Sequence, residues 1–208
     1  IDNYPEDKVE YFDAEDNPED ENTKSHKMAF SKRVYIERED FMEVPVKGYH
    51  RLYPGNEIRL KYTYYVTCTS VEKDDNGNII AVHCNYDPES RGGTTEDKRK
   101  VKGTSHWVSA DHALCAEVRQ YDKLFKAEDP GKATGNYLDD LNTDSLIILD
   151  KVYVEEEGKN AKVGDYLQFV RNGYYCVDCK DSTEEHMVFN RTCTLKDSWA
   201  KLKQKMGI

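Results

Sequence analysis

The stretch that decides the fold reads Lys100-Val101-Lys102-Gly103-Thr104-Ser105-His106-Trp107-Val108-Ser109-Ala110. Its basic start leads into a segment typical of a strand, in which Trp107 offers a large face for packing. We therefore interpret His106 and Trp107 as packing residues at the centre of the fold. After a short polar break, residues 116–125 carry apolar side chains that would suit a helix as well as a strand, so periodicity alone does not decide this segment.

On the N-terminal side, alternation of apolar and polar residues predicts β structure. Residues 28–37 alternate well enough for a strand, and residues 38–46 are typical of a loop or short helical turn. The longest alternation covers residues 57–73, where one face would carry Ile58, Leu60, Tyr62, Tyr64, Val66 and Cys68. This period of two predicts one long strand. Asn76-Gly77 then predicts a hairpin, because both central residues tolerate positive φ, with residues 79–86 as the partner strand.

On the C-terminal side, short apolar runs alternate with turn residues. We expect strands at 145–155, 166–171, 174–178 and 187–192, with Asn172-Gly173 closing a second tight hairpin. Short helices are expected at 137–141 and, from the spacing of Leu195, Trp199 and Leu202, at 194–205. Many short strands and few helices favour an all-β barrel architecture.

Length and hydropathy limit the class of protein. A chain of 208 residues can form one large domain or two small ones, each with a core. No apolar run approaches the ~20 residues of a membrane-spanning helix. The first residues, Ile1 to Pro5, lack an initiator Met and the features of a signal peptide, so we expect part of a longer chain.

The negative charge is concentrated at one end. Ten acidic side chains and only Lys8 lie in residues 1–23, which leaves 30 acidic and 29 basic residues among the others. We expect residues 1–23 to form an acidic, mostly extended and solvated arm. If the protein binds nucleic acid, local basic patches rather than net charge must attract the phosphates.

The six cysteines do not suggest a disulfide framework or a metal site. Without a secretory signal they fit a reducing cytosol. Cys176 and Cys179 have the spacing of half a zinc site, but Cys193 and His186 do not supply a standard second half. We expect no metal and interpret these cysteines as small packing residues in strands.

The quoted stretch resembles the anticodon-binding region of glutaminyl-tRNA synthetases, a family of class I ligases. Further segments similar to that family, in the same order, are 36–41, 57–60, 71–74, 167–169, 173–176, 188–192 and 197–201. The resemblance implies two six-stranded β-barrels of the ribosomal-protein-like type, with short helices that include a C-terminal one. It places residues 24–110 mostly in the proximal barrel and 111–208 mostly in the distal barrel, with shared strands. It also implies that 1–23 is partly a strand and that 116–125 is a strand.

The resemblance implies a module that recognises a tRNA anticodon. The full chain would ligate L-glutamine to its tRNA using ATP and Mg²⁺. The two ATP signatures of class I synthetases are absent here, as are a P-loop and a G-x-G-x-x-G motif. We therefore expect no catalytic residues, cofactor or metal in this segment, and a cytoplasmic monomer. Its expected partners are glutamine tRNA and the catalytic domain of the same chain, without membrane or DNA.

The same resemblance suggests which residues read the anticodon. Arg51, supported by His50 and Lys47, would contact the third base, a G whose O6 and N7 match the guanidinium fork. Arg59 and Lys61, on one face of the long strand, would lie near the first base, and Gln168 and Arg171 around the central U. Possible contacts to the RNA backbone, or simply solubilising groups, are Lys98, Arg99, Lys100 and Lys102.

Two alternatives remain open. One is a glutamyl-tRNA synthetase of the archaeal or eukaryotic type, which shares this architecture. The other is a free-standing ribosomal-RNA-binding barrel protein with no enzymatic activity. An upstream extension of about 300 or more residues carrying the two ATP signatures would separate a ligase from the free-standing protein.

Overall fold

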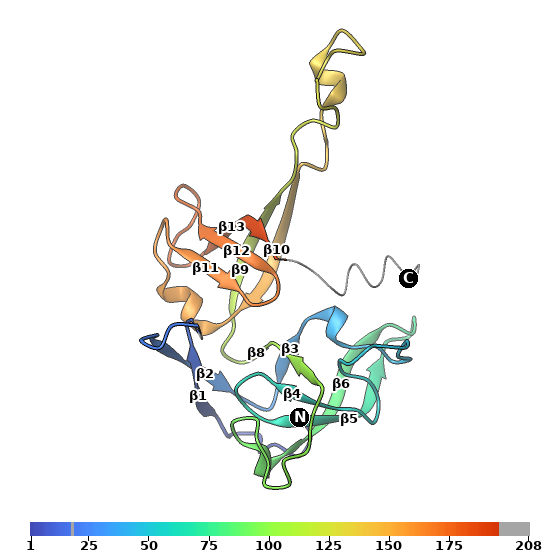
Figure 1. The fold of residues 1–208 in the computed structure, drawn as a ribbon, viewed down its shortest axis with the longest axis vertical. Coiled ribbons are helices and arrows are strands. Elements are labelled where there is room, and N and C mark those ends of the chain that lie inside the picture. Colours follow the sequence, from blue (N-terminus) through green and yellow to red (C-terminus); the bar gives the residue numbers. More distant parts are fainter. Residues whose placement is uncertain (18, 196–208) are drawn as a thin grey trace. The chain divides into compact units, whose positions relative to one another are not determined.

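The structure is a computed structural model that describes residues 1–17 and 19–195. The chain divides into two compact units (Figure 1). Unit 1 comprises residues 1–114 and 154–158, and unit 2 comprises residues 115–153 and 159–208. Unit 1 is therefore built from two separate stretches of sequence, because five residues return to it after the chain has entered unit 2.

Unit 1 contains one four-stranded sheet and two strand pairs. The sheet has the order β6-β5-β4-β7, formed by Ile79–Asp87, Tyr65–Lys73, Glu57–Leu60 and Gly103–Ser105. The pairs are β1 (Glu10–Glu15) with β2 (Ser25–Phe30) and β3 (Val34–Ile36) with β8 (Trp107–Ser109). β4 and β7 run parallel, whereas the other pairings are antiparallel.

Trp107 lies at the centre of the unit 1 core, as the sequence predicts. Its ring is 1% exposed and meets Phe30 edge to face at 5.1 Å, and its indole N–H donates to the carbonyl of Lys61 at 2.9 Å. Phe30 also contacts Tyr4, Phe12 and Tyr64. The quoted stretch therefore supplies the ring around which β2 and the four-stranded sheet pack.

The prediction of one long strand over residues 57–73 is wrong. The chain reverses between β4 and β5, where Tyr62 adopts φ +69° and the N–H of Thr63 donates to the carbonyl of Leu60 at 3.0 Å. In the resulting antiparallel pair Ile58 lies opposite Val66, and both side chains enter the core. Because cross-strand partners share a sheet face, the alternation of apolar residues continues through the turn. Periodicity therefore did not reveal the break.

The acidic segment 1–23 is partly a strand, as the resemblance implies, and most of its other residues are exposed. β1 pairs with β2 along its whole length, and Phe12 and Ala14 enter the core while Tyr11, Asp13 and Glu15 stay exposed. Tyr4, 1% exposed, also lies in the core. The abundance of carboxylates hid an ordinary strand pattern with one apolar face.

Glu10 shows how the core accepts one of these carboxylates. It accepts hydrogen bonds from the hydroxyls of Tyr4 at 2.8 Å and Tyr64 at 2.9 Å, and it pairs with Lys8 at 2.9 Å. Burial raises the pKa of Glu10, but these hydrogen bonds outweigh it and hold the pKa at about 2. The charge thus joins the N-terminal residues to Tyr64, which directly precedes β5.

Two further strand predictions are refined by the structure. Residues 28–37 are divided between β2 and β3 rather than forming one strand, and the 3₁₀ helix η1 (Arg38–Asp40) follows. The hairpin between β5 and β6 is confirmed, but only Gly77 has positive φ, at +81°. The side chain of Asp74 accepts the N–H groups of Asn76 and Asn78, which holds the turn without a left-handed Asn76.

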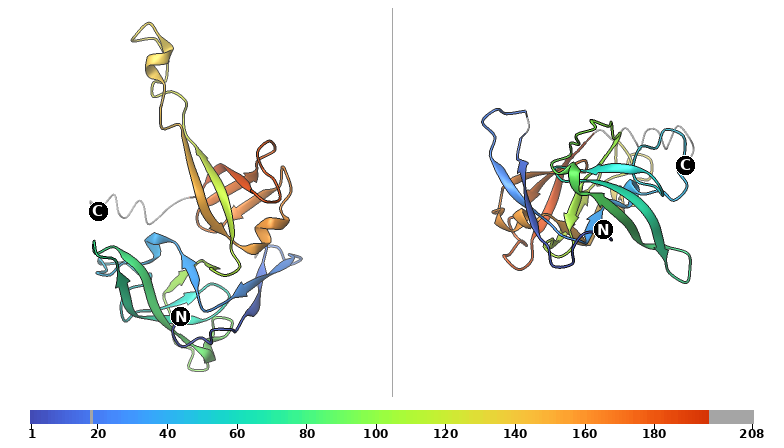
Figure 2. Two further views of the ribbon diagram at one scale, coloured as in Figure 1. Left: turned by 180° about the vertical axis from the view of Figure 1, so that it is seen from behind. Right: turned by 90° about the horizontal axis from the view of Figure 1, so that it is seen from below.

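Unit 2 contains a five-stranded sheet with the order β10-β9-β13-β12-β11. Its strands are β9 (Leu114–Tyr121), β10 (Leu146–Val154), β11 (Tyr166–Phe169), β12 (Gly173–Val177) and β13 (Val188–Thr194). The strand expected within 116–125 is confirmed as far as Tyr121. The β11–β12 hairpin is also confirmed, but its turn is formed by residues 170–172, and Gly173 already lies in β12 opposite Phe169. β9 and β10 run side by side, and the 3₁₀ helix η3 (Tyr137–Asp140) lies in the connection between them (Figure 2).

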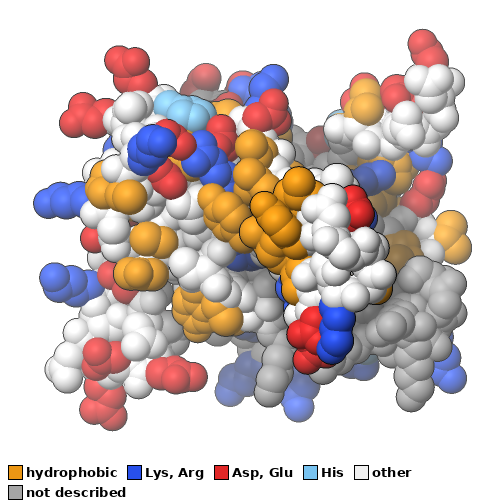
Figure 3. All heavy atoms as spheres, turned by 90° about the horizontal axis from the view of Figure 1, so that it is seen from above, with side chains coloured by type: hydrophobic (Ala, Val, Ile, Leu, Met, Phe, Trp, Pro, Cys, Tyr) orange, Lys and Arg blue, Asp and Glu red, His pale blue; other side chains and the backbone are white. Residues whose placement is uncertain are grey.

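β10 is an edge strand with an unusual apolar run. Leu146, Ile147, Ile148 and Leu149 are each 39–52% exposed. Figure 3 shows hydrophobic side chains at several places on the surface that it draws, with a group near the centre of the view. In the described residues this strand therefore has apolar side chains on both of its faces in contact with solvent.

The mostly-β class is confirmed, whereas closure into barrels is not observed. The sheets of both units are open, and each helix of the described residues is a short 3₁₀ helix, η2 (Pro88–Ser90) and η4 (Glu156–Asn160) being the other two. The expected helix at 194–205 lies outside the described residues except for its first two positions, and Thr194 ends β13. No helix in residues 1–17 and 19–195 is long and apolar enough to cross a membrane.

Candidate nucleic-acid interface

Arg51 stabilises a buried carboxylate. Its Nη1 lies 3.0 Å from Oδ1 of Asp40, which has no exposed surface, and donates to the carbonyl of Glu39 at 3.2 Å. The hydroxyl of Ser105 on β7 donates to the other oxygen of Asp40. Arg51 therefore holds η1 in place, and its guanidinium is fixed by this pairing while 22% of the side chain stays exposed.

The loop before Arg51 presents the other two residues of this predicted group. His50 and Lys47 are exposed, whereas Tyr49 between them is buried and donates its hydroxyl to the carbonyl of Glu39 at 3.0 Å. A Cβ at Gly103 would lie 2.2 Å from the carbonyl oxygen of His50, so only glycine allows β7 to approach this loop. The loop is thus held from two sides, with His50 and Lys47 facing solvent.

Arg59 and Lys61 do not lie on one strand as expected. Arg59 is in β4, and Lys61 is the first residue of the turn that follows. The Nη2 of Arg59 donates to the hydroxyl of Tyr65 at 3.3 Å, and the ammonium of Lys61 lies 4.7 Å from the ring centroid of Tyr62. Both cations are therefore placed against tyrosine rings at the same end of the β4–β5 hairpin.

Of the four basic residues before β7, Arg99 differs from the lysines. It forms ion pairs with Glu57 at 2.8 Å and Asp97 at 3.1 Å and also pairs with Asp87. These hydrogen bonds, that to Glu57 first, raise the pKa of Arg99 further above its ordinary value. Its charge is locally neutralised, which favours a structural role. Lys98, Lys100 and Lys102 are exposed.

Gln168 and Arg171 belong to unit 2. Gln168 is exposed on β11 and lies opposite Tyr174 of β12, which is 43% exposed. Arg171, also exposed, adopts φ +69° in the turn between these strands. The structure brings Gln168 and Arg171 together at one hairpin. It places the groups of Arg51 and Arg59 in the other unit.

A second polar cluster in unit 1 was not predicted. Glu155, from the returning segment, accepts hydrogen bonds from His26 at 2.8 Å and His106 at 3.0 Å, and His26 also contacts Asp16 at 2.7 Å. Burial raises the pKa of Glu155, but the two imidazoles outweigh it and hold the pKa at about 2. The hydrogen bond to Glu155 raises the pKa of His26 to about 9, against a smaller effect of burial. His106 was interpreted only as a packing residue.

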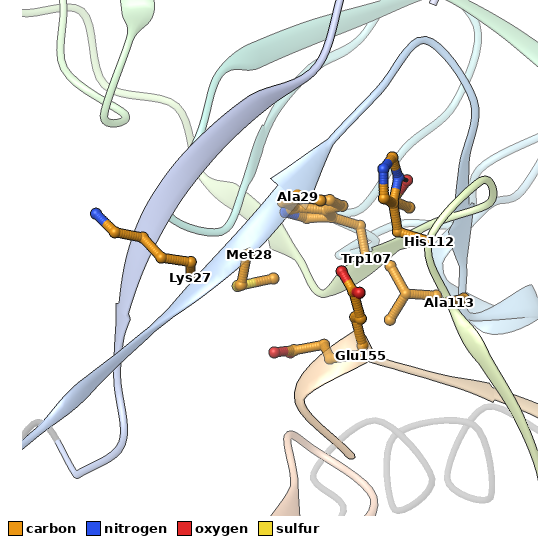
Figure 4. Close-up of a pocket in the computed structure, with 10 residues that line it drawn as sticks. Lys27, Met28, Ala29, Trp107, His112, Ala113 and Glu155 are labelled. Atoms are coloured by element: carbon orange, nitrogen blue, oxygen red, sulfur yellow. Dashed lines mark hydrogen bonds between the residues drawn. The ribbon is translucent and has the colours of Figure 1, made fainter. Parts of the chain in front are cut away.

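A shallow recess adjoins this cluster (Figure 4). Its lining includes Lys27, Met28, Trp107, His112 and Glu155. The Nδ1 of His112 contacts the hydroxyl of Ser109 at 3.0 Å. No group of three or more metal-ligating side chains is present in the part of the chain that the structure describes. The arrangement therefore suits packing and ion pairing, and none of the predicted RNA-contact residues lines this recess.

The sequence did not reveal the residues that hold Arg59 in place. Tyr65 was assigned to the outer face of a long strand, but it is 2% exposed because the chain turns before it. Gly93, which follows Gly92 in the loop after η2, is buried against Arg59. The paired glycines were the only local signal, and they do not specify which side chain needs the space.

The chain is similar to proteins of one family along most of its length. Two family models, both described as tRNA synthetases class I (E and Q), anti-codon binding domain, match residues 1–87 and 104–178. A glutamine–tRNA ligase of Rhodopirellula baltica is 48% identical over 99% of this chain and 34% of its own length. A glutamine–tRNA ligase of Clostridioides difficile is 45% identical over 96% of this chain and 36% of its own length. The chain thus spans about a third of the length of the curated relatives it matches.

Proposed function

Because the chain belongs to the anticodon-binding domains of the class I tRNA synthetases (E and Q), we propose that it recognises the anticodon of glutamine tRNA within a longer glutamine–tRNA ligase. The observation that carries this proposal is the coverage of nearly the whole chain by relatives named glutamine–tRNA ligase. In this role the segment itself performs no chemistry. ATP, Mg²⁺ and the amino acid would bind to the remaining two thirds of the full-length ligase, which acts in the cytoplasm.

The finer assignments follow the family's layout. Each unit would correspond to one of the family's two barrels, although its sheets are open in the structure, with β9 and β10 joining the two units. Arg51, His50 and Lys47 would recognise the third anticodon base, Arg59 and Lys61 would lie near the first, and Gln168 and Arg171 near the second. Lys98, Lys100 and Lys102 would contact phosphates, while Arg99 is retained for its ion pairs. The cations on ordered loops and the exposed amide beside Tyr174 support this arrangement, since RNA readers splay and stack unpaired bases.

The experiment that tests the proposal compares stem-loops ending in G, as in glutamine anticodons, with those ending in C, as in glutamate anticodons. Arg51→Lys is preferred to Arg51→Ala, because a lysine keeps a positive charge near buried Asp40. Lysine lacks the planar fork that donates to O6 and N7 of guanine. We expect weaker binding of the G loop by ~1–3 kcal/mol with little change for the C loop.

Lys100→Ala is the matched control, since loss of a phosphate contact weakens both loops about equally. If Arg51→Lys lowers the affinity for both loops by one factor, Arg51 does not read the third base. Wild-type protein that prefers the C loop would indicate the glutamyl enzyme. Wild-type protein that binds all loops equally would favour the free-standing ribosomal-RNA-binding protein.

A further inference from the structure

Two arginines lie within cation–π distance of the buried ring of Tyr65 and differ in their charge environment. The guanidinium carbons of Arg59 and Arg99 lie 5.5 and 5.2 Å from the ring centroid. Arg99 is neutralised by three carboxylates. Arg59 contacts only the ring and hydroxyl of Tyr65 among the interactions of the described residues, and none of these partners is an acid.

The Nε atom of Arg59 is buried and has no hydrogen-bond acceptor within the described ranges 1–17 and 19–195. A buried donor without an acceptor costs about 1–3 kcal/mol. The second guanidinium beside the same ring adds a like charge. Arg59 therefore has no counter-charge among its described partners, and an oxygen of an RNA ligand would supply one to the part of the guanidinium that is not buried.

Two residues hold Arg59 in this position. The hydroxyl of Tyr65 accepts a hydrogen bond from Nη2 of Arg59 at 3.3 Å and donates one to the carbonyl of Gly93 at 3.0 Å. Gly93 has φ +78°, and a Cβ there would lie 2.9 Å from Cδ and 3.0 Å from Nε of Arg59. The hydroxyl of Ser90 accepts the backbone N–H of Tyr65 at 2.8 Å and so ties the same loop to β5.

We infer that Tyr65 and Gly93 are positioning residues, which hold the guanidinium of Arg59 for a hydrogen-bond acceptor of the RNA, either a base carbonyl or a phosphate oxygen. This inference rests on the proposed function, because it requires RNA as the ligand. Tyr65 and Gly93 are thus given a role in RNA binding. The inference also explains why the second of the paired glycines, Gly93, lies against Arg59, whereas Gly92 is exposed.

Gly92 provides a control matched in backbone strain. Its φ is also +78°, but a Cβ there would meet no atom within 4 Å. Both Gly92→Ala and Gly93→Ala therefore strain the loop, and only Gly93→Ala displaces Arg59. We expect Gly93→Ala to weaken binding of a glutamine anticodon stem-loop roughly 10-fold, the loss of one hydrogen bond to a charged group, and Gly92→Ala less than about 2-fold.

Tyr65→Phe is a second variant in case Gly93→Ala does not fold. Its control is Tyr64→Phe, since Tyr64 is equally buried but donates to Glu10 instead. Both Gly93→Ala and Tyr65→Phe are repeated in an Arg59→Ala background. We expect no further loss of binding there, because a positioning residue has nothing left to position.

The two sources of the acceptor are separated by salt and base changes. If Arg59 contacts a phosphate, Arg59→Ala reduces the log–log salt slope by about 0.7–0.9 for every loop. If it contacts a base, the effect of Arg59→Ala disappears for loops in which that base is replaced. Two results would overturn the inference if the wild-type protein still discriminates between loops. One is that Gly92→Ala and Gly93→Ala weaken RNA binding equally. The other is that the losses of affinity caused by Gly93→Ala and Tyr65→Phe add fully to the loss caused by Arg59→Ala. Failure of the proposed function appears instead as wild-type protein that does not discriminate.

Discussion

Raising the pH from 6.5 to 9 is expected to destabilise unit 1, because His26 loses its proton in that range. The folded protein raises the pKa of His26 from an ordinary 6.5 to about 9, chiefly through the hydrogen bond to Glu155. A raised pKa contributes stability that is complete below the unfolded pKa and is lost as the pH rises through the folded one. The groups that face His26 are Asp16 and Glu155, and Glu155 also accepts from His106.

The magnitude follows from the two pKa values. The difference between about 9 and 6.5, at about 1.4 kcal/mol per pH unit, gives an upper limit of about 3–4 kcal/mol. On the acid side, Glu155 has a folded pKa of about 2 and an ordinary value of 4.5, so its contribution is lost as the pH falls from 4.5 to 2. Both values describe largely the same ion pair and are not added. Maximum stability of this cluster therefore lies between pH 4.5 and 6.5.

The assay is urea unfolding followed by the fluorescence of buried Trp107, in a Trp199→Phe background that leaves one tryptophan. The free energy of unfolding is measured from pH 5 to 9 for this protein and for His26→Gln, whose amide keeps a donor but does not titrate. His50→Gln, at an exposed histidine of the same unit, is the control. We expect the difference in free energy of unfolding between the protein with His26 and the His26→Gln variant to shrink as the pH rises. A constant difference across this range would refute the reasoning.

Three further predictions concern Arg99, salt and catalysis. Arg99→Ala is expected to lower the free energy of unfolding by about 1–2 kcal/mol, because Glu57, Asp87 and Asp97 then repel one another, whereas Lys100→Ala leaves the urea midpoint unchanged. Binding to anticodon stem-loops should weaken with salt, with a log–log slope of roughly -3 to -5 if four to six phosphates are contacted, and a flat response would exclude the lysine clusters from the interface. The isolated chain should show no glutamine-dependent pyrophosphate exchange, so measurable exchange by pure protein would disprove the absence of a catalytic site.

Local signals predicted much of the strand arrangement. The β5–β6 and β11–β12 hairpins follow from Asn-Gly pairs between apolar runs, and the burial of Trp107 follows from its place in a strand-like segment. The reversal at Tyr62 was not predictable by the same means. A tyrosine with φ +69° gives no turn signal, and residues on both sides of the turn face the same core.

The sequence identified the basic residues of the candidate site but not the side chains that pair with them. Resemblance to a known family gave Arg51, Arg59 and Arg99 as basic residues without distinguishing their environments. The carboxylate that holds Arg51 comes from η1, and Glu57, which pairs with Arg99, lies 42 residues before it. Such pairs depend on strand register and chain reversal, which periodicity does not encode.

The return of Val154–Gly158 to unit 1 also orders the events of synthesis. As the chain leaves the ribosome, residues 1–114 emerge before Glu155, which lies 129 residues after His26 and 49 after His106. Until it emerges, the two imidazoles have no carboxylate between them, and unit 1 waits for a segment made after the first half of the unit 2 sheet. A nascent chain paused before residue 155 would therefore hold an unfinished unit 1. Unit 1 is then completed late in synthesis, by contacts between residues far apart in the sequence, and does not fold as a finished domain before unit 2 is begun.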